Sequence, residues 1–230
     1  MIVPPQLTLD LLAPEACSFD NFLAGENEEL VAQMRDLAEG RRSEPCLFLW
    51  GQAGAGKTHL LQAALGAAVT AGRKALLLGR DAILSVSGEP ALIAIDDLDR
   101  WPGERQADLF SLYNDLRAAG GTLLAASRQP LPALALREDL RTRLGWGLIY
   151  EVHPLRDEAK AQALIDYARR RGFRLPEEVV HFLLSRARRD LPTLLSLLAA
   201  LDQYSLAAQR PVTIPLVRDL LQRSLGACRT

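Results

Sequence analysis

Residues 51–58 combine three glycines, a lysine and a hydroxyl side chain in a spacing typical of phosphate binding. Glycine lets backbone N–H groups converge on phosphate oxygens because it has no side chain in the way. Lys57 can neutralise terminal phosphates, and Thr58 can offer its hydroxyl to magnesium. The alternative, a glycine-rich turn that only joins a strand to a helix, leaves this lysine and threonine unexplained. We therefore predict that the loop binds ATP or ADP with Mg²⁺, through Gly51, Gly54, Ala55, Gly56, Lys57, Thr58 and the adjoining His59.

A second group of polar residues follows the apolar run at residues 92–95. Asp96 comes directly after this run, where the carboxyl end of a strand can bring a carboxylate close to the phosphate loop. We expect Asp96 to hold Mg²⁺ through water and Asp97 to polarise the attacking water. For Asp97, an exposed acidic turn is the alternative. Asp99 is expected to face solvent.

These residues need a sheet to bring them together, and the sequence alternates short apolar runs with helical periodicity. Continuous apolar runs are typical of parallel strands buried on both faces. Apolar residues at helical spacing follow the loop and recur near residue 112, which indicates core helices. We predict an α/β fold with a parallel central sheet flanked by helices, the strands being residues 47–50, 75–78, 92–95, 122–126 and 148–152.

The pattern changes after His153 and becomes helical. Asp157 can cap one helix, Pro176 can lie in the first turn of another, and Thr213 can start a last one. We expect three parts: an extended arm at residues 1–14, an α/β nucleotide-binding domain at 15–153 and a small helical domain at 154–230.

Composition excludes several classes of protein. Lys and Arg total 27 against 28 Asp and Glu, a net charge of -1 that disfavours direct DNA binding by the whole chain. The three cysteines and three histidines lack the spacing of a metal site, so we expect reduced thiols and no zinc. Without a signal peptide or an apolar stretch of about 18 residues, we expect a cytoplasmic protein with no membrane partner.

Four segments together resemble a known family. They are Phe19-Asp-Asn-Phe22 with the Gly25 segment, the two nucleotide motifs, and Arg141-Thr-Arg143-Leu-Gly-Trp-Gly147. They are similar to the AAA+ core of the bacterial replication initiator DnaA, over most of residues 18–225. The resemblance implies a P-loop AAA+ domain followed by a helical lid. An initiator would add a helix-turn-helix DNA-binding domain after the lid, so we expect a regulatory relative that acts on DnaA rather than the initiator itself.

The arm strengthens this expectation. Gln6-Leu7-Thr-Leu9-Asp-Leu11 is similar to the motif by which a DnaA regulator docks on the beta subunit of the DNA polymerase sliding clamp. Physically, an extended segment can present the Gln6 amide to backbone groups, with Leu9 and Leu11 in an apolar groove. The resemblance implies that DNA is contacted mainly through the clamp. The alternative is that the arm packs on its own domain as an edge strand.

The resemblance also implies a catalytic arginine. In the family, an Arg of the motif around Arg143 acts in trans as an arginine finger, so Arg143 is expected to reach ATP bound to a neighbouring DnaA. Arg141 is the second candidate. The alternative is a surface arginine that pairs with Glu138 or Asp139.

Three further positions lie in or near the segments that resemble the family. Trp146 is expected to pack the hinge between sheet and lid. Ser127 stands where AAA+ proteins place a polar sensor, but a hydroxyl bonded within the fold is an equal alternative. At the start of the lid helix, Pro192 occupies a position where the family has a nucleotide-contacting Arg, and Arg188 or Arg189 is a candidate substitute.

The sequence favours a regulator of replication initiation that stimulates hydrolysis of DnaA-bound ATP and so prevents re-initiation. A self-sufficient ATPase that assembles a replication complex, as helicase loaders do, remains open because both nucleotide motifs are intact. A pure adaptor with structural ADP also remains open, as does a homo-oligomer that hides the arm.

Overall fold

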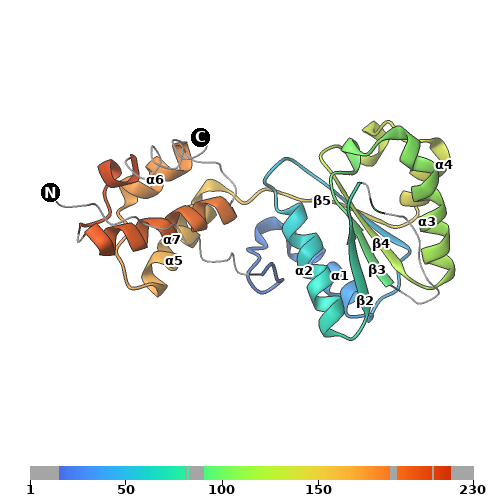
Figure 1. Ribbon diagram of the computed structural model, residues 1–230, viewed down its shortest axis with the longest axis horizontal. Helices are drawn as coiled ribbons and strands as arrows, with labels where there is room; N and C mark the ends of the chain where they lie inside the picture. Colours follow the sequence, from blue (N-terminus) through green and yellow to red (C-terminus); the bar gives the residue numbers. More distant parts are fainter. Residues whose placement is uncertain (1–15, 81, 83–90, 187–190, 209, 219–230) are drawn as a thin grey trace. The chain divides into compact units, whose positions relative to one another are not determined.

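The computed structural model describes residues 16–80, 82, 91–186, 191–208 and 210–218. They form two compact units, Ala16–Leu155 and the residues from Arg156 onward, which Figure 1 shows as an α/β part and a helical part. The predicted arm, with Gln6, Leu7, Leu9 and Leu11, lies outside the described residues, as do Arg188 and Arg189. Among the described residues, no helix has the length and apolar character needed to cross a membrane.

The first unit contains the predicted parallel sheet. Its strands occur in the order β2-β3-β4-β1-β5, and every pairing is parallel. β1 lies between β4 and β5, which places the strand before the phosphate loop inside the sheet. All five predicted strands are present within about a residue of their expected ends, as β1 (Cys46–Trp50), β2 (Lys74–Leu78), β3 (Ala91–Ile95), β4 (Thr122–Ser127) and β5 (Leu148–Glu151).

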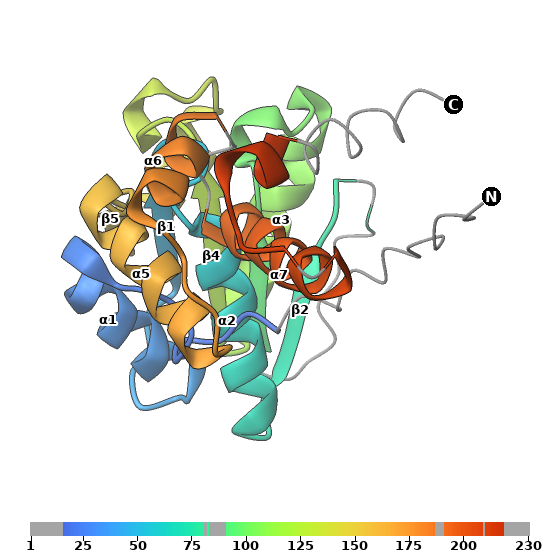
Figure 2. The same cartoon turned by 90° about the vertical axis from the view of Figure 1, so that its left-hand side faces the viewer.

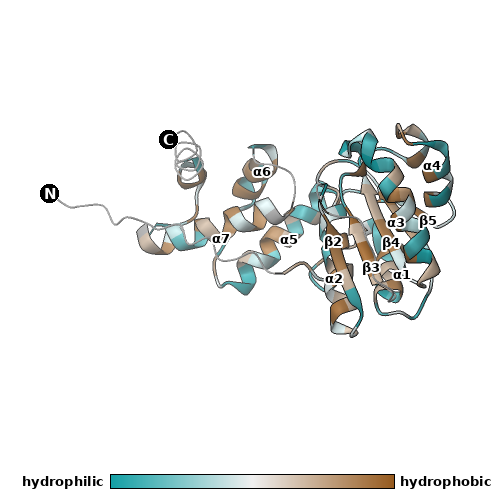
Figure 3. Ribbon diagram, turned by 45° about the vertical axis from the view of Figure 1, so that its right-hand side comes forward, coloured by the Kyte–Doolittle hydropathy of each residue, from teal (hydrophilic) through white to brown (hydrophobic). Residues whose placement is uncertain are grey.

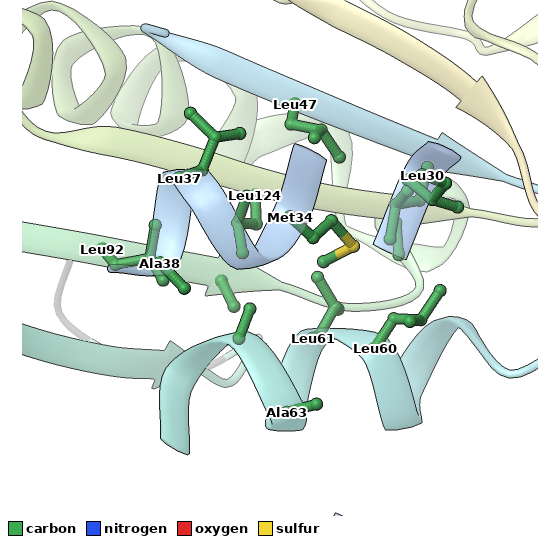
Figure 4. Close-up of a cluster of buried hydrophobic side chains, with 14 of the residues drawn as sticks. Leu30, Met34, Leu37, Ala38, Leu47, Leu60, Leu61, Ala63, Leu92 and Leu124 are labelled. Carbon is green, nitrogen blue, oxygen red and sulfur yellow. The ribbon is translucent and has the colours of Figure 1, made fainter. Parts of the chain in front are cut away.

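Alternating residues of β1 face two different cores, as the period of a strand requires. Leu47 and Leu49 belong to the core on one face, with helices α1 (Glu28–Ala38) and α2 (Lys57–Thr70). Figure 4 shows residues from both helices and from β1, β3 and β4 meeting in this cluster. Cys46 and Phe48 belong to the other core, with α3 (Gln106–Ala118) and α4 (Glu138–Leu144). The apolar runs of the inner strands β1, β3 and β4 are thus buried on both faces.

The two edge strands differ from the prediction. β2 and β5 are apolar apart from Lys74 and Glu151, and we expected all five strands to be buried on both faces. Instead Leu76, Leu77 and Ile149 are 53%, 43% and 45% exposed. An edge strand pairs on one side only and is covered less completely, so an apolar run alone does not establish double burial. Figure 3 shows β2 as apolar along most of its length, in contrast to the largely polar helix α4.

The second unit is helical. Helices α5 (Asp157–Arg170), α6 (Glu177–Arg186) and α7 (Leu191–Ala208) enclose their own core, centred on leucines such as Leu164, Leu183 and Leu198, and Figure 2 shows the three helices packed together. Arg156 is the N-cap of α5, so Asp157 lies in the first turn rather than at the predicted cap. Pro176 directly precedes α6, and a further helical segment starts at residue 214, after Thr213.

The turn between α4 and β5 is closely packed. At Gly147, an added Cβ would lie 1.9 Å from the carbonyl oxygen of Cys46, the first residue of β1. Only glycine allows the backbone of this turn to approach β1 so closely. The turn that contains Trp146 is therefore fixed against the sheet.

We expect Gly147→Ala to lower the free energy of unfolding by about 3 kcal/mol, because the methyl group has to displace backbone rather than a flexible side chain. Urea unfolding of the whole chain measures the change. Gly66→Ala is the matched control. A Cβ at Gly66 meets nothing within 4 Å, and alanine in a helix interior is more favourable than glycine by roughly 0.5–1 kcal/mol. Equal stability of the two variants would contradict the expectation.

Candidate nucleotide-binding site

The phosphate loop joins the end of β1 to the start of α2, and two of its glycines are required by their surroundings. Gly51 has φ 155°, and a Cβ there would lie 2.6 Å from the carbonyl oxygen of Val152. Gly56 has φ 104°, and its Cβ would lie 2.7 Å from the ring of Phe22. The bare backbone forms a cradle with its N–H groups at the N-terminus of α2, which suits a phosphate.

Lys57 lies inside this cradle and is 6% exposed. Its Nζ donates to the carbonyl oxygens of Gly51 (2.6 Å) and Gln52 (2.9 Å). Burial lowers the pKa of Lys57, and the charges of Asp96 and Asp97 oppose that shift. Among the described residues, Lys57 forms no ion pair with a carboxylate. Its positive charge is therefore held in the loop without a direct anionic partner.

Thr58 and Asp96 lie together at the mouth of the loop. The Thr58 hydroxyl donates to Asp96 Oδ2 at 2.5 Å, and the backbone N–H of Asp97 donates to Asp96 Oδ1 at 2.8 Å. The described residues contain no cluster of three His, Cys, Asp or Glu that could hold a metal. Mg²⁺ in nucleotide sites is bound by few protein groups, and water and phosphate supply its other ligands. Thr58 and Asp96 therefore fit a magnesium site that depends on a nucleotide.

Asp97 adopts the left-handed backbone conformation, with φ 48°. Aspartate tolerates this conformation better than most residues. Its carboxylate pairs with Arg100 at 3.3 Å and lies 3.9 Å from Arg128. Arg128 was not singled out from the sequence, although it follows Ser127 directly. The predicted water-polarising carboxylate is thus placed beside Asp96 but in contact with cations.

We expected Asp99 to face solvent, but its carboxylate is bonded within the fold. Its Oδ1 accepts hydrogen bonds from the Ser127 hydroxyl (3.3 Å) and from the backbone N–H of Arg128 (3.0 Å). Ser127 is fully buried, and its own carbonyl oxygen accepts a bond from the N–H of Gly51 at 3.2 Å. The Ser127 hydroxyl is thus bonded within the fold, and its sensor role stays a prediction. The end of β4 is in this way tied to the first residue of the loop.

His59 contacts the segment that precedes α1 instead of the loop itself. Its Nε2 lies 2.9 Å from the carbonyl oxygen of Ser18, and its ring centroid lies 5.3 Å from that of Phe22. Phe22 also contacts Gly56, so this segment forms a wall of the loop. The sequence signalled Phe22 only as part of the family motif and gave no physical reason for its position.

Arg143 lies in the last turn of α4. Its guanidinium lies over the ring of Trp146, 4.2 Å from the centroid, and 5.7 Å from that of Phe110. The alternative pairing of Arg143 with Glu138 or Asp139 is not observed among the described residues, and Asp139 pairs with Arg137 at 2.8 Å. Within the described part of the chain, Arg143 forms no ion pair. Trp146 is 52% exposed, and its role at the hinge between sheet and lid stays a prediction.

The arginine and the phosphate loop lie toward opposite ends of β1. Gly147, next to Trp146, contacts Cys46 at the start of β1, whereas the loop follows Trp50 at its end. The strand spans about 13 Å between these residues. The structure therefore does not bring Arg143 to the loop of its own chain.

The fold and the site define a class of protein. A parallel five-stranded sheet in the order β2-β3-β4-β1-β5, with a glycine-rich phosphate loop after β1, a carboxylate after β3 and a helical unit after β5, is the AAA+ arrangement of a P-loop protein.

Comparison with known proteins narrows this class. Residues 14–77 match the family model of the bacterial DnaA ATPase domain, and residues 157–221 match that of the Hda lid domain. The chain is similar to domain III of the replication initiation protein DnaA from Thermotoga maritima, with 22% identity and a TM-score of 0.71 over 90% of this chain and 95% of the other. It is also similar to AMPPCP-bound DnaA from Aquifex aeolicus, with 24% identity and a TM-score of 0.64 over 79% and 64%. A RuvB variant from Thermotoga maritima shares the fold at 18% identity, with a TM-score of 0.66 over 90% and 71%. The two family matches and the shared fold are consistent with an Hda-like AAA+ protein of the DnaA type.

The position of Lys57 leads to a prediction about stability. We expect Lys57→Met to abolish stabilisation by ADP and Mg²⁺, which for wild type at a ligand concentration of 100 times Kd is about 2.7 kcal/mol. Without nucleotide, the variant should unfold within a few degrees of wild type at pH 7, because the lost hydrogen bonds are offset by relief of a buried charge.

The lowered pKa of Lys57 fixes the sign of the pH dependence. Below this pKa the folded state carries the full desolvation penalty of the charged amine, and the penalty fades as pH rises through the lowered pKa. The stability of the variant relative to wild type should therefore fall at alkaline pH. Thermal melting with and without ADP measures both effects, with the exposed Lys74→Met as the control that keeps the ligand response. A full ADP response in Lys57→Met would refute the assignment.

Proposed function

We propose that this protein regulates the initiation of DNA replication by stimulating hydrolysis of ATP bound to the initiator DnaA. The observation that carries the proposal is the state of Arg143: its guanidinium is partly exposed, lies against aromatic rings and forms no ion pair within the described residues. The matches to the bacterial DnaA ATPase domain and to the Hda lid domain support DnaA as the partner.

The protein's own loop binds ATP or ADP in this proposal. Backbone N–H groups of the loop and the ammonium of Lys57 bind the phosphates, while Thr58 and Asp96 hold Mg²⁺, which when bound neutralises phosphate charge. The wall formed by Phe22 and His59 borders the loop and excludes water from one side of it. The bound nucleotide stabilises the unit that presents Arg143. Related DnaA structures contain the ATP analogue AMPPCP, which supports an adenine nucleotide as the ligand.

The chemistry asked of Arg143 suits a guanidinium. It stays charged at all physiological pH values, and its planar fork can bind two phosphate oxygens as negative charge develops on them. Because Arg143 lies toward the end of β1 that is remote from its own loop, we propose that it completes the site of ATP bound to a neighbouring DnaA. Hydrolysis then returns DnaA to its ADP form and prevents re-initiation.

Recruitment to DNA is assigned to the arm. We propose that Gln6, Leu7, Leu9 and Leu11 dock on the beta subunit of the sliding clamp as an extended segment. The net charge of -1 supports contact with DNA mainly through the clamp. In this proposal the protein acts in the cytoplasm, at DNA that the clamp already encircles.

A second function is favoured by one observation. Lys57, Thr58, Asp96 and Asp97 all lie at the loop, so the chain has the residues that a self-sufficient ATPase requires. Such a protein would assemble a replication complex in the manner of a helicase loader. Rapid turnover of ATP by this protein alone, stimulated by single-stranded DNA and indifferent to DnaA, would establish that function in place of the first.

We expect Arg143→Ala to reduce stimulated hydrolysis by about 10³-fold or more, the effect typical of an arginine finger. Phosphate release is measured from DnaA loaded with labelled ATP, mixed with this protein, clamp and DNA. Arg143→Lys should also be severely impaired, because a lysine keeps the charge but not the planar fork.

Arg141→Ala is the matched control for this experiment, since Arg141 lies two residues before Arg143 on the same short helix. We expect it to stay within about threefold of wild type. Loss of stimulation in Arg141→Ala with activity retained in Arg143→Ala would transfer the role to Arg141.

The arm is tested separately. Replacing Gln6, Leu9 and Leu11 by alanine should remove binding to the clamp in a pull-down and abolish the increase in hydrolysis that the clamp produces. Alanine at Thr8 and Asp10 is the control, because alternate residues of an extended segment point to opposite sides. Retained clamp binding by the first variant would sink the assignment.

A further inference from the structure

Trp146 has a position that the folding of its unit does not explain. The indole is 52% exposed and does not belong to either apolar core of the α/β unit. Leaving a large aromatic ring half in water forgoes most of the stabilisation that its burial would give. Its recorded contacts are instead with two guanidinium groups, those of Arg143 (4.2 Å from the ring centroid) and Arg117 (5.1 Å).

The backbone holds the indole in place independently of these cations. The N–H of Gly145 donates to the carbonyl oxygen of Arg141 (3.0 Å), and that of Trp146 donates to the carbonyl oxygen of Arg143 (3.2 Å). On the other side of Trp146, Gly147 is closely packed against Cys46. The ring therefore extends from a turn that is fixed at both ends.

The aromatic rings contact the Arg143 guanidinium in a way that leaves its N–H donors and its charge free to bind an anion. An aromatic face attracts a cation through its quadrupole, and a guanidinium lying over it keeps its N–H donors at the rim of the group. A carboxylate would instead take up those donors and cancel the charge. Phe110 lies 5.7 Å from the same guanidinium, so two aromatic rings from different elements border it. Arg143 is in this way restricted in its motion and still able to bind an anion.

We propose that Trp146 is a positioning residue that holds the Arg143 guanidinium in the orientation in which it meets the phosphates of a partner's nucleotide. The inference rests on the proposed function of Arg143 and adds to it the residue that pre-orders the arginine. A long side chain that is already restricted loses less conformational freedom on reaching the phosphate. Trp146 thus acts on the reacting phosphate only through Arg143.

The first test separates the rate of the stimulated reaction from the affinity of the two proteins. Trp146→Leu keeps apolar bulk but removes the aromatic face, and Trp146→Phe keeps a face. In the reconstituted hydrolysis assay, we expect Trp146→Leu to lower the maximal stimulated rate about tenfold, because misplacing a catalytic group by about an ångström has an effect of this order or larger. The concentration for half-maximal stimulation should change by less than about twofold, and Trp146→Phe should recover most of the rate.

Ile149→Ala is the matched control, since Ile149 is a half-exposed apolar residue three positions along the chain. It should behave as wild type. A change in half-maximal concentration alone in Trp146→Leu would make Trp146 an interface contact and overturn the inference. A rate for Trp146→Leu equal to that of wild type would overturn it as well.

The second test needs no partner and so separates failure of this inference from failure of the proposed function. In the isolated protein, NMR of the arginine Nε–Hε groups, assigned with Arg143→Lys, should show the Arg143 resonance displaced by the ring current of Trp146. The displacement should be lost in Trp146→Leu and largely kept in Trp146→Phe. An Arg143 resonance that is the same in wild type and Trp146→Leu overturns the inference even if DnaA-bound ATP is hydrolysed. If wild type stimulates no hydrolysis at all, the proposed function fails, and the inferred role of Trp146 is overturned with it.

Discussion

The parallel pairing of β1 with both β4 and β5 is the constraint on which the rest of the structure depends. Because β1 is an inner strand, its residues alternate between two buried cores and its two ends are held firmly. The loop that follows its last residue is tied to Ser127 at the end of β4 and to Val152 after β5. The turn that contains Gly147 packs against Cys46, the first residue of β1. One strand thus positions the phosphate loop at one end and the turn beside Arg143 at the other.

The two cations at these ends are kept unpaired by different physical means. Lys57 is buried among carbonyl oxygens of its own loop, and the resulting desolvation lowers its pKa. Arg143 remains partly in water and lies over aromatic rings. A lysine is a compact charge whose pKa shifts readily on burial, whereas a guanidinium keeps its charge and stacks on planar groups. Each residue type therefore suits its environment, and within the described residues neither is neutralised by an ion pair with a carboxylate.

Much of the fold could be predicted from short apolar runs, because inner parallel strands such as β1 and β4 require unbroken burial. The phosphate loop could be predicted too, since its glycines, lysine and threonine have few other uses in that spacing. Double burial of Leu76 and Ile149 was wrongly expected because an apolar run does not reveal which strands lie at the edges. The bonds of Asp99 to Ser127 and Arg128, and the stacking of Trp146 on Arg143, join residues on different elements. Local sequence does not encode such contacts.

The separation of the two ends of β1 also bears on what the chain does with its own nucleotide. Hydrolysis of a nucleoside triphosphate is slow without an arginine that stabilises charge in the transition state. Arg143 lies toward the end of β1 opposite the loop, so it does not supply that group to the site beside Lys57. Arg128, the cation near Asp97, is engaged with a carboxylate at 3.9 Å. Within the described α/β unit, neither Arg143 nor Arg128 therefore supplies an arginine finger to a nucleotide in the protein's own loop. In the proposed function, the loop would accordingly stabilise and orient the α/β unit, and Arg143 would act on the nucleotide of a partner.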